Sequence, residues 1–350
     1  ALLLSGLAVV AGAAGTLYGL SQLSKSRLQV RVLRPQKRLR EAEHSRSDGG
    51  PAEGSQNGKQ ENCDHSARYR GIRLLQLNVC LLPLVHVTRD DRKEERFHHL
   101  LQRLDSYDVV TLQEVWTLPW MSQARRCAEL LAREGFFVVY TEPPVWSPLG
   151  LNCGNLIASR FPVAHASSHV YTSSDGWQRI VPNAALLADV QVPGCEPLAV
   201  VSTHLHTDNS FTPRGVQFAP VRTAQVRELA AWLDRALDKE RHHVVVAGDM
   251  NIRAPSNEYE NTVRLLGAHA CAMREAGFPS TLDPKCFLST GSWSDPDALG
   301  CVDHVLAASP LPEEGLRIGH AKAVQTSPPL SDHLPVSVRI ELPRRRRRRG

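Results

Sequence analysis

The stretch Val244-Val245-Val246-Ala247-Gly248-Asp249-Met250-Asn251 joins a run of apolar, strand-forming residues to a short polar ending. Branched residues such as valine favour a strand. Asp249 and Asn251 are two residues apart, so in an extended segment both side chains point to the same face. The glycine between the two parts lets another backbone segment approach closely. The stretch therefore predicts a buried strand that delivers a carboxylate and an amide to one edge of a sheet.

Four further apolar runs end in the same way, at Leu77-Asn78, Gln113-Glu114, Thr203-His204 and Ser331-Asp332-His333. Sheets flanked by helices build their sites at strand ends, so these polar endings predict one common site. Magnesium takes oxygen ligands. With a metal held by carboxylates, the histidines are free for proton transfer and for stabilising negative charge.

Strands and helices alternate over most of the chain. We expect strands at 72–77, 109–112, 184–192, 198–202, 244–247, 302–307 and 335–342, and helices at 92–104, 122–133 and 226–237. Pro193-Gly194 marks a hairpin turn between two of the strands. Strands joined both by hairpins and by helices favour an α/β sandwich over an open parallel sheet. The pattern predicts one catalytic domain over residues 68–343.

The segments outside this domain differ sharply from it. Residues 1–24 carry no charge, and a helix of about 23 residues spans roughly 34 Å, enough to cross a bilayer. We therefore expect an N-terminal transmembrane helix that anchors the protein. A cleaved signal peptide is the alternative, because residues 11–14 are small. Residues 25–67 read as a basic juxtamembrane segment followed by a disordered linker, and residues 344–350 as a polybasic tail.

Charge is distributed unevenly along the chain. The formal net charge is +5, yet residues 68–343 hold 30 acidic and 26 basic residues. A nuclease normally needs a basic face, so this acidic body argues against nucleic acid as a partner. The basic flanks suit an anionic lipid surface, where each Lys or Arg contributes about 1 kcal/mol. Basic residues follow the apolar segment, so we expect the catalytic part to face the cytosol. We expect the apolar segment to be anchored in the endoplasmic reticulum or mitochondrial membrane. The eight cysteines show no metal-binding spacing and read as reduced structural thiols.

The chemistry of the polar endings suggests distinct roles. A carboxylate at the end of a buried strand needs a partner, so we assign Glu114 to the metal. The amide of Asn78 can contact a phosphoryl oxygen. His333 is a suitable base for water, provided that a carboxylate holds its tautomer, and Asp303 is the best candidate for that carboxylate.

The order and spacing of these motifs resemble the endonuclease/exonuclease/phosphatase superfamily, metal-dependent hydrolases of phosphate esters, over roughly residues 70 to 342. The resemblance implies a four-layer α/β sandwich, with two packed mixed sheets and helices outside. It implies that Asp249 and Asn251 position the reacting groups, and that Asp332 lies beside the metal. His204 would then donate to a non-bridging oxygen as charge builds.

Within the superfamily, three segments resemble neutral sphingomyelinases: Asn78-Val79-Cys80-Leu81-Leu82-Pro83, Gln113-Glu114-Val115-Trp116 and Thr203-His204-Leu205-His206, with Asn152-Cys153-Gly154 as a further match. This likeness implies a magnesium-dependent sphingomyelin phosphodiesterase that releases ceramide and phosphocholine at a membrane surface. Asn183 is a departure, because relatives often carry a lysine near that place.

Other functions stay open at this point. Gly248-Asp249-Met250-Asn251-Ile252-Arg253 is also similar to the pattern of inositol-phospholipid 5-phosphatases, and another phospholipid phosphodiesterase or a nuclease would use the same site. A catalytically dead scaffold would be expected to lack at least one of the principal site residues, and all are present.

Overall fold

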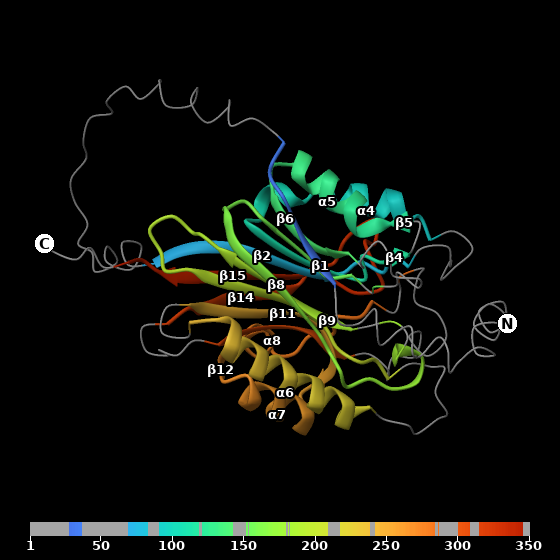
Figure 1. Cartoon of the computed structure of the whole chain (residues 1–350), viewed down its shortest axis with the longest axis vertical. Coiled ribbons are helices and arrows are strands. Elements are labelled where there is room, and N and C mark those ends of the chain that lie inside the picture. Colours follow the sequence, from blue (N-terminus) through green and yellow to red (C-terminus); the bar gives the residue numbers. More distant parts are fainter. Residues whose placement is uncertain are drawn as a thin grey trace, which may run out of the picture.

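The computed structural model describes residues 28–36, 69–82, 91–118, 121–142, 152, 154–179, 181, 183–208, 218–238, 242–283, 286, 300–308 and 315–345. In this part of the chain, two mixed sheets pack face to face, and helices cover their outer faces (Figure 1). The predicted α/β fold with two packed mixed sheets is therefore confirmed.

The first sheet has seven strands in the order β1-β6-β7-β3-β2-β15-β14. Their bounds are Gln29–Leu33 (β1), Phe137–Glu142 (β6), Leu156–Ser159 (β7), Val109–Gln113 (β3), Tyr69–Asn78 (β2), Val336–Pro343 (β15) and Arg317–Ala323 (β14). Two helices, α4 (Lys93–Leu101) and α5 (Gln123–Arg133), pack on its outer face (Figure 1). A short turn of 3-10 helix, η3 (Leu104–Ser106), follows α4, and a small hairpin of β4 (Thr117–Leu118) and β5 (Met121–Ser122) precedes α5.

The second sheet has six strands in the order β12-β13-β11-β10-β9-β8. Their bounds are Ala268–Cys271 (β12), Cys301–Ala308 (β13), His243–Ala254 (β11), Leu198–His204 (β10), Ala184–Val190 (β9) and Val163–Val170 (β8). The helices α6 (Ala219–Ala236) and α7 (Asn257–Leu265) lie on the side of this sheet away from the first (Figure 1). The short helix α8 (Ala272–Glu275) contacts β13 of this sheet and β14 of the first sheet. The 3-10 helix η4 (Gly176–Arg179) lies in the connection from β8 to β9.

Alternation along β2 separates the two faces of the first sheet. Ile72 and Leu74 belong to the core between the sheets, whereas Leu75 and Leu77 pack with the helices α4 and α5. Successive side chains of a strand point to opposite faces. The same alternation therefore directs Gln76 and Asn78 into the space between the sheets, although neither is apolar.

Two parallel strand pairs gather the polar endings. Strand β2 runs parallel to β3, which sets Asn78 opposite Gln113, and β10 runs parallel to β11, which sets His204 opposite Asp249. Gly248 makes the second pairing possible, because a Cβ atom at this position would lie 1.9 Å from the carbonyl oxygen of Thr203. All four endings consequently meet at one end of the sandwich.

Two boundaries differ from those predicted. Residues 29–33, assigned above to the juxtamembrane segment, form β1 and pair antiparallel with β6, because an alternating Gln-Val-Arg-Val-Leu sequence can extend the sheet at its free edge. At the other end, Arg344 pairs with Cys195, and the Arg345 guanidinium lies 3.1 Å from a Glu196 carboxylate oxygen. The first two arginines of the predicted tail thus dock on the turn between β9 and β10.

The predicted anchor at residues 1–24 lies outside the described residues, as do most of the linker and the rest of the tail. None of the helices that the structure describes combines the length and the apolar character needed to cross a bilayer. Cys80, Cys127, Cys195, Cys271 and Cys301 are buried free thiols, which agrees with the expected reduced state.

Candidate active site

A histidine and an aspartate form a buried pair in the site. His333 lies just before β15, and Asp303 lies in β13 of the other sheet; the Nδ1 atom of His333 is 2.8 Å from Asp303 Oδ2. Burial lowers the pKa of His333, but the negative charges of Asp303 and Asp249 outweigh this effect and hold it well above the usual value of an imidazole. The carboxylate fixes the tautomer, so that Nε2 points away from Asp303.

Asp249 is the centre of the arrangement. Its Oδ2 atom lies 3.5 Å from Nε2 of His204 and 3.7 Å from Nε2 of His333. The same oxygen accepts a hydrogen bond from the Asn78 side chain at 3.0 Å. Since Asn78 belongs to the first sheet and Asp249 to the second, this contact closes the site across the sandwich.

Glu114 follows β3 and is partly exposed. Its backbone has a φ of 57°, a left-handed conformation that a non-glycine residue rarely adopts, and it turns the chain at the strand end. The carboxylate accepts from the Asn78 amide at 2.9 Å and from the Trp116 ring at 3.3 Å. Asn78 therefore joins Glu114 to Asp249 through one amide nitrogen.

The remaining predicted residues lie around this centre. Asn251, also left-handed with a φ of 52°, donates its backbone N–H to Asp249 and its side-chain amide to the Leu205 carbonyl oxygen. Nδ1 of His204 is buried and makes no hydrogen bond to any described residue. Asp332 accepts from the Ser331 hydroxyl at 3.0 Å.

The donor atoms fit a divalent cation. One ligand atom from each of Asp249, Asp303 and His333 lies within 4.8 Å of the other two, and all three residues are buried. Asp332 is not among them. Both oxygens of Asp303 are already engaged, one by His333 and the other by Gln76. Glu114 and Asp249, which flank the Asn78 amide, retain oxygen lone pairs for a hard cation.

Sequence reasoning assigned no role to several polar residues that lie beneath the site. Gln76 donates from its side-chain nitrogen to Gln113 at 2.8 Å and to Asp303 at 3.0 Å, and Gln113 donates to Ser202 at 3.0 Å. The signal was a glutamine inside the apolar run Leu74-Leu75-Gln76-Leu77. Buried polar side chains are usually hydrogen-bonded, so such a residue implies a partner even before the partner is known.

Arg96 of α4 was missed as well. Only 2% of it is exposed, and its guanidinium donates to four backbone carbonyl groups. These belong to Val79 and Cys80 after β2, to Leu330 before His333, and to Asp91, at distances of 2.6 to 2.8 Å. Arg96 thus ties the segment that follows Asn78 to the loop that carries His333.

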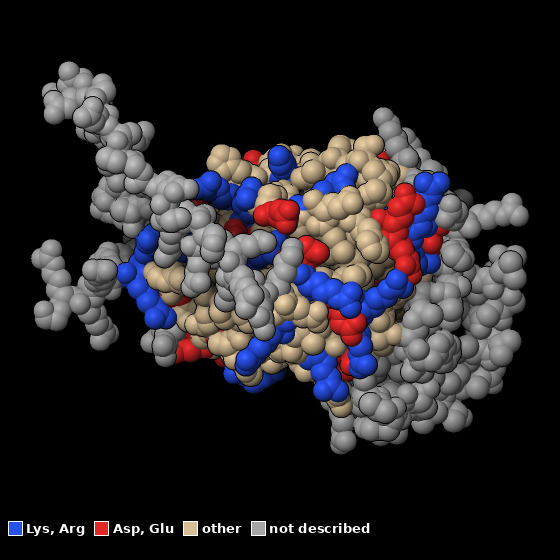
Figure 2. Space-filling model, turned by 90° about the horizontal axis from the view of Figure 1, so that it is seen from above, with Lys and Arg blue, Asp and Glu red and all other residues tan. Residues whose placement is uncertain are grey.

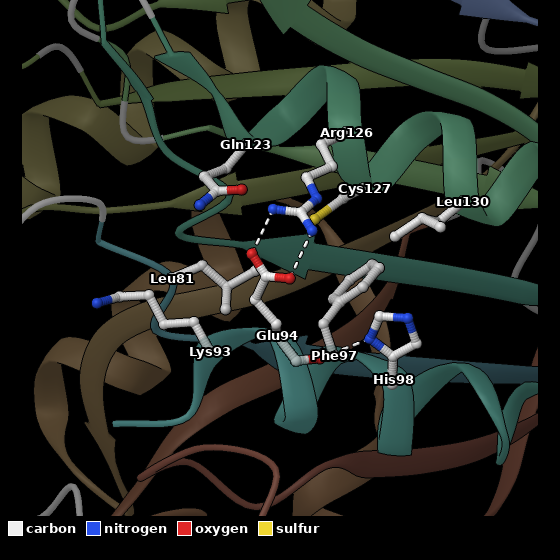
Figure 3. A pocket seen from close by; sticks show the side chains of 9 residues that line it. All are labelled: Leu81, Lys93, Glu94, Phe97, His98, Gln123, Arg126, Cys127 and Leu130. Carbon is white, nitrogen blue, oxygen red and sulfur yellow. Dashed lines mark hydrogen bonds and ion pairs between the residues drawn. The ribbon is translucent and has the colours of Figure 1, made fainter. Parts of the chain in front are cut away.

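A shallow cavity also lies between α4 and α5, on the outside of the first sheet (Figure 3). Leu81, Phe97 and Leu130 supply apolar lining, and Glu94 and Arg126 form an ion pair across it. None of the predicted site residues lines this cavity. The chemistry is therefore better sought at the strand ends.

Known structures show the same fold. Sphingomyelinase C from Streptomyces griseocarneus superposes with a TM-score of 0.59 at 19% identity, covering 77% of this chain and 99% of its own. A double mutant of beta toxin from Staphylococcus aureus with bound magnesium ions gives 0.59 at 16% identity, covering 77% and 99%. TDP2 from D. rerio, complexed with single-strand DNA product, gives 0.56 at 18% identity, covering 77% and 98%.

At these identities the likeness establishes the fold alone. No curated protein sequence matches the chain. From residue 75 to residue 333, however, the sequence matches the model of the Endonuclease/Exonuclease/phosphatase family. This match spans most of the chain and both sheets of the sandwich, and the protein is a member of that family.

Proposed function

We propose that the protein is a magnesium-dependent phosphodiesterase that hydrolyses sphingomyelin to ceramide and phosphocholine at a membrane surface. The carrying observation is the convergence of Asn78, Glu114, His204, Asp249 and His333 at one end of the sandwich, with Asn78 bridging two carboxylates. This donor set suits a phosphate ester, because it combines a base, hydrogen-bond donors and carboxylates for a cation.

In this proposal, Nε2 of His333 takes a proton from water, and Asp303 holds the ring through Nδ1. The water oxygen forms a bond to phosphorus, and the bond from phosphorus to the ceramide oxygen breaks. The ceramide oxygen takes a proton from solvent and leaves as a hydroxyl group, and His333 returns its proton to solvent. His204 and the Asn251 amide hold the phosphoryl group while its negative charge grows. Both N–H bonds of the Asn78 amide are donated to Glu114 and Asp249, so Asn78 positions these two carboxylates.

The metal belongs in this proposal at Glu114. When bound, magnesium supplies positive charge to the phosphoryl oxygens. Asp332, the second ligand expected from the superfamily resemblance, is adjacent to His333 and accepts a hydrogen bond from Ser331. In the proposal, Asp332 is the second ligand of the cation. The group formed by Asp249, Asp303 and His333 is the alternative position for the cation.

Lipid is favoured over nucleic acid because of charge. The domain over residues 68–343 is net acidic, and Figure 2 shows a face on which acidic and basic side chains lie beside one another. A nucleic-acid hydrolase gains its affinity from a continuous basic surface. The three sphingomyelinase-like segments and the uncharged N-terminal stretch add to the case for a membrane substrate. The fold by itself is neutral on this point, because both sphingomyelinase C and TDP2 share it.

The location follows from the same proposal. Residues 1–24 anchor the protein in the endoplasmic reticulum or mitochondrial membrane, the catalytic domain faces the cytosol, and the basic flanks bind anionic lipids. A fluorescence protease-protection assay in permeabilised cells tests this orientation.

The substrate is tested by incubating purified protein with three probes in magnesium: sphingomyelin vesicles, phosphatidylinositol bisphosphate vesicles and abasic DNA. Release of phosphocholine from the first is the expected result. Release of inorganic phosphate from the second would replace the proposal with a 5-phosphatase, and cleavage of the third would replace it with a nuclease.

A further inference from the structure

We propose that Gln76 is a positioning residue, whose amide holds the Asp303 carboxylate and through it the ring of His333. The inference rests on the proposed function, in which His333 is the base. Gln76 is fully buried in β2, on the face directed toward the second sheet. Its neighbours in the strand at positions 74, 75 and 77 are leucines, so packing alone would be served by an apolar side chain.

The contacts of Gln76 complete the hydrogen bonding of Asp303. Oδ1 of Asp303 accepts from the Gln76 amide at 3.0 Å, and Oδ2 lies 2.8 Å from the His333 ring nitrogen. Asp303 is itself fully buried. A buried carboxylate requires donors. With one donor on each oxygen, the carboxylate plane is fixed, and so is the direction of the ring that it holds.

The orientation of the Gln76 amide is determined by its partners. Both hydrogen bonds use the nitrogen, while the oxygen is buried and accepts from no described residue. Turning the amide over would set its oxygen against the acceptor oxygens of Asp303 and Gln113. Gln113 is in turn held by Ser202, to which it donates at 3.0 Å. Within the described residues, the Gln76 oxygen therefore has no donor, while the N–H₂ group is directed at Asp303.

The contact also crosses the sandwich. Gln76 lies in the seven-stranded sheet and Asp303 in the six-stranded sheet, so their bond sets the two sheets relative to each other directly beneath the base. The amide therefore acts on the reaction through Asp303 and touches no reacting atom. Small displacements of catalytic groups cost large factors in rate, up to about 10² for 1 Å.

The test is Gln76→Met, which keeps the length of the side chain and removes the donor. The matched control is Thr111→Val. Thr111 is the partner of Gln76 in the adjacent parallel strand, lies in the same fully buried layer, and has a hydroxyl with no hydrogen bond to any described residue. On sphingomyelin vesicles, kcat of Gln76→Met should fall about 10- to 100-fold with KM changed less than about 3-fold, and Thr111→Val should match the wild type.

Two further measurements separate positioning from general damage. In an Asp303→Asn background, Gln76→Met should cause no additional loss of kcat, because its effect passes through the carboxylate. An equal loss in both backgrounds, or a kcat equal to that of Thr111→Val, would overturn the inference.

The downfield proton resonance of the His333 Nδ1–H group gives a readout that needs no turnover. It should be present in the wild type and shift in Gln76→Met, but not in Thr111→Val. If the wild type hydrolyses none of the lipid substrates, the proposed function fails, whereas an unmoved resonance in Gln76→Met refutes the positioning role itself.

Discussion

Replacing Arg96 by lysine separates the effect of the four hydrogen bonds that its guanidinium donates from the effect of its buried positive charge. The guanidinium donates to four carbonyl groups on three segments. A lysine keeps the charge but has a single nitrogen, which cannot reach all three segments together. We expect at least two of the four hydrogen bonds to be lost. Each is worth about 1 to 2 kcal/mol when a charged donor is buried, so the free energy of unfolding should fall by about 2 to 4 kcal/mol.

The loss can be read from urea unfolding followed by tryptophan fluorescence. For a domain of this size, with a slope near 3 kcal/mol per molar urea, the midpoint should drop by about 1 M. The control is Arg126→Lys on α5, where the arginine side chain is 51% exposed and pairs with an exposed Glu94. Exposed ion pairs contribute about 0 to 1 kcal/mol, so this midpoint should barely move.

Activity gives the second readout of Arg96→Lys. Arg96 holds the segment after Asn78 and the loop of His333, so kcat should fall together with stability. At urea concentrations below the unfolding midpoint, kcat should be about 10- to 100-fold lower than in the wild type. If Arg96→Lys unfolded at the same urea concentration as Arg126→Lys, the four contacts would carry no net stability and the reasoning would be refuted.

The other predictions concern the base, the metal and one acid-sensitive contact. His333→Ala should lower kcat about 10²- to 10⁴-fold with an unchanged circular dichroism spectrum, and more than a tenth of wild-type turnover would exclude it as the base. Chelation by EDTA should stop hydrolysis, and added magnesium should restore it. Glu114→Gln should raise the magnesium concentration needed for the half-maximal rate. Full activity in the presence of chelator would exclude a role for the metal in catalysis. Burial raises the pKa of Glu228, but hydrogen bonds from the His169 ring and two backbone N–H groups lower it more, to about 2. A carboxyl group with a lowered pKa in the folded state stabilises the fold at pH values above its pKa in the unfolded state. This stabilisation is lost as the pH falls toward 2, so Glu228→Gln should lower the free energy of unfolding at pH 7 and lower it progressively less toward pH 3. A gap in urea midpoint that stayed constant with pH would contradict this.

Sequence reasoning recovered the strand ends because their signal is local. An apolar run followed by Asn78 or Asp249 can be read without knowing the neighbouring strands, and parallel pairing then brings such endings together. The hairpin at Pro193-Gly194 was predicted for the same reason, and the antiparallel pair of β9 and β10 confirms it.

Residues whose roles depend on distant partners could not be assigned in this way. Arg96 contacts Leu330 across 234 positions of sequence, and Gln76 contacts Asp303 across 227. No local pattern encodes such pairs. Strand β1 was missed because its arginines suggested a membrane flank, while its pairing depends on the free edge of β6, which only the assembled sheet reveals.

The division of the site between the two sheets has a consequence for folding. Asn78 and Glu114 come from the first sheet, and His204, Asp249 and Asp303 come from the second. Either sheet alone carries half of the chemistry, and the hydrogen bond between Asn78 and Asp249 forms only after the two have packed. The site is therefore complete only when the two sheets have packed together, and a partly folded chain with one sheet formed lacks part of the site.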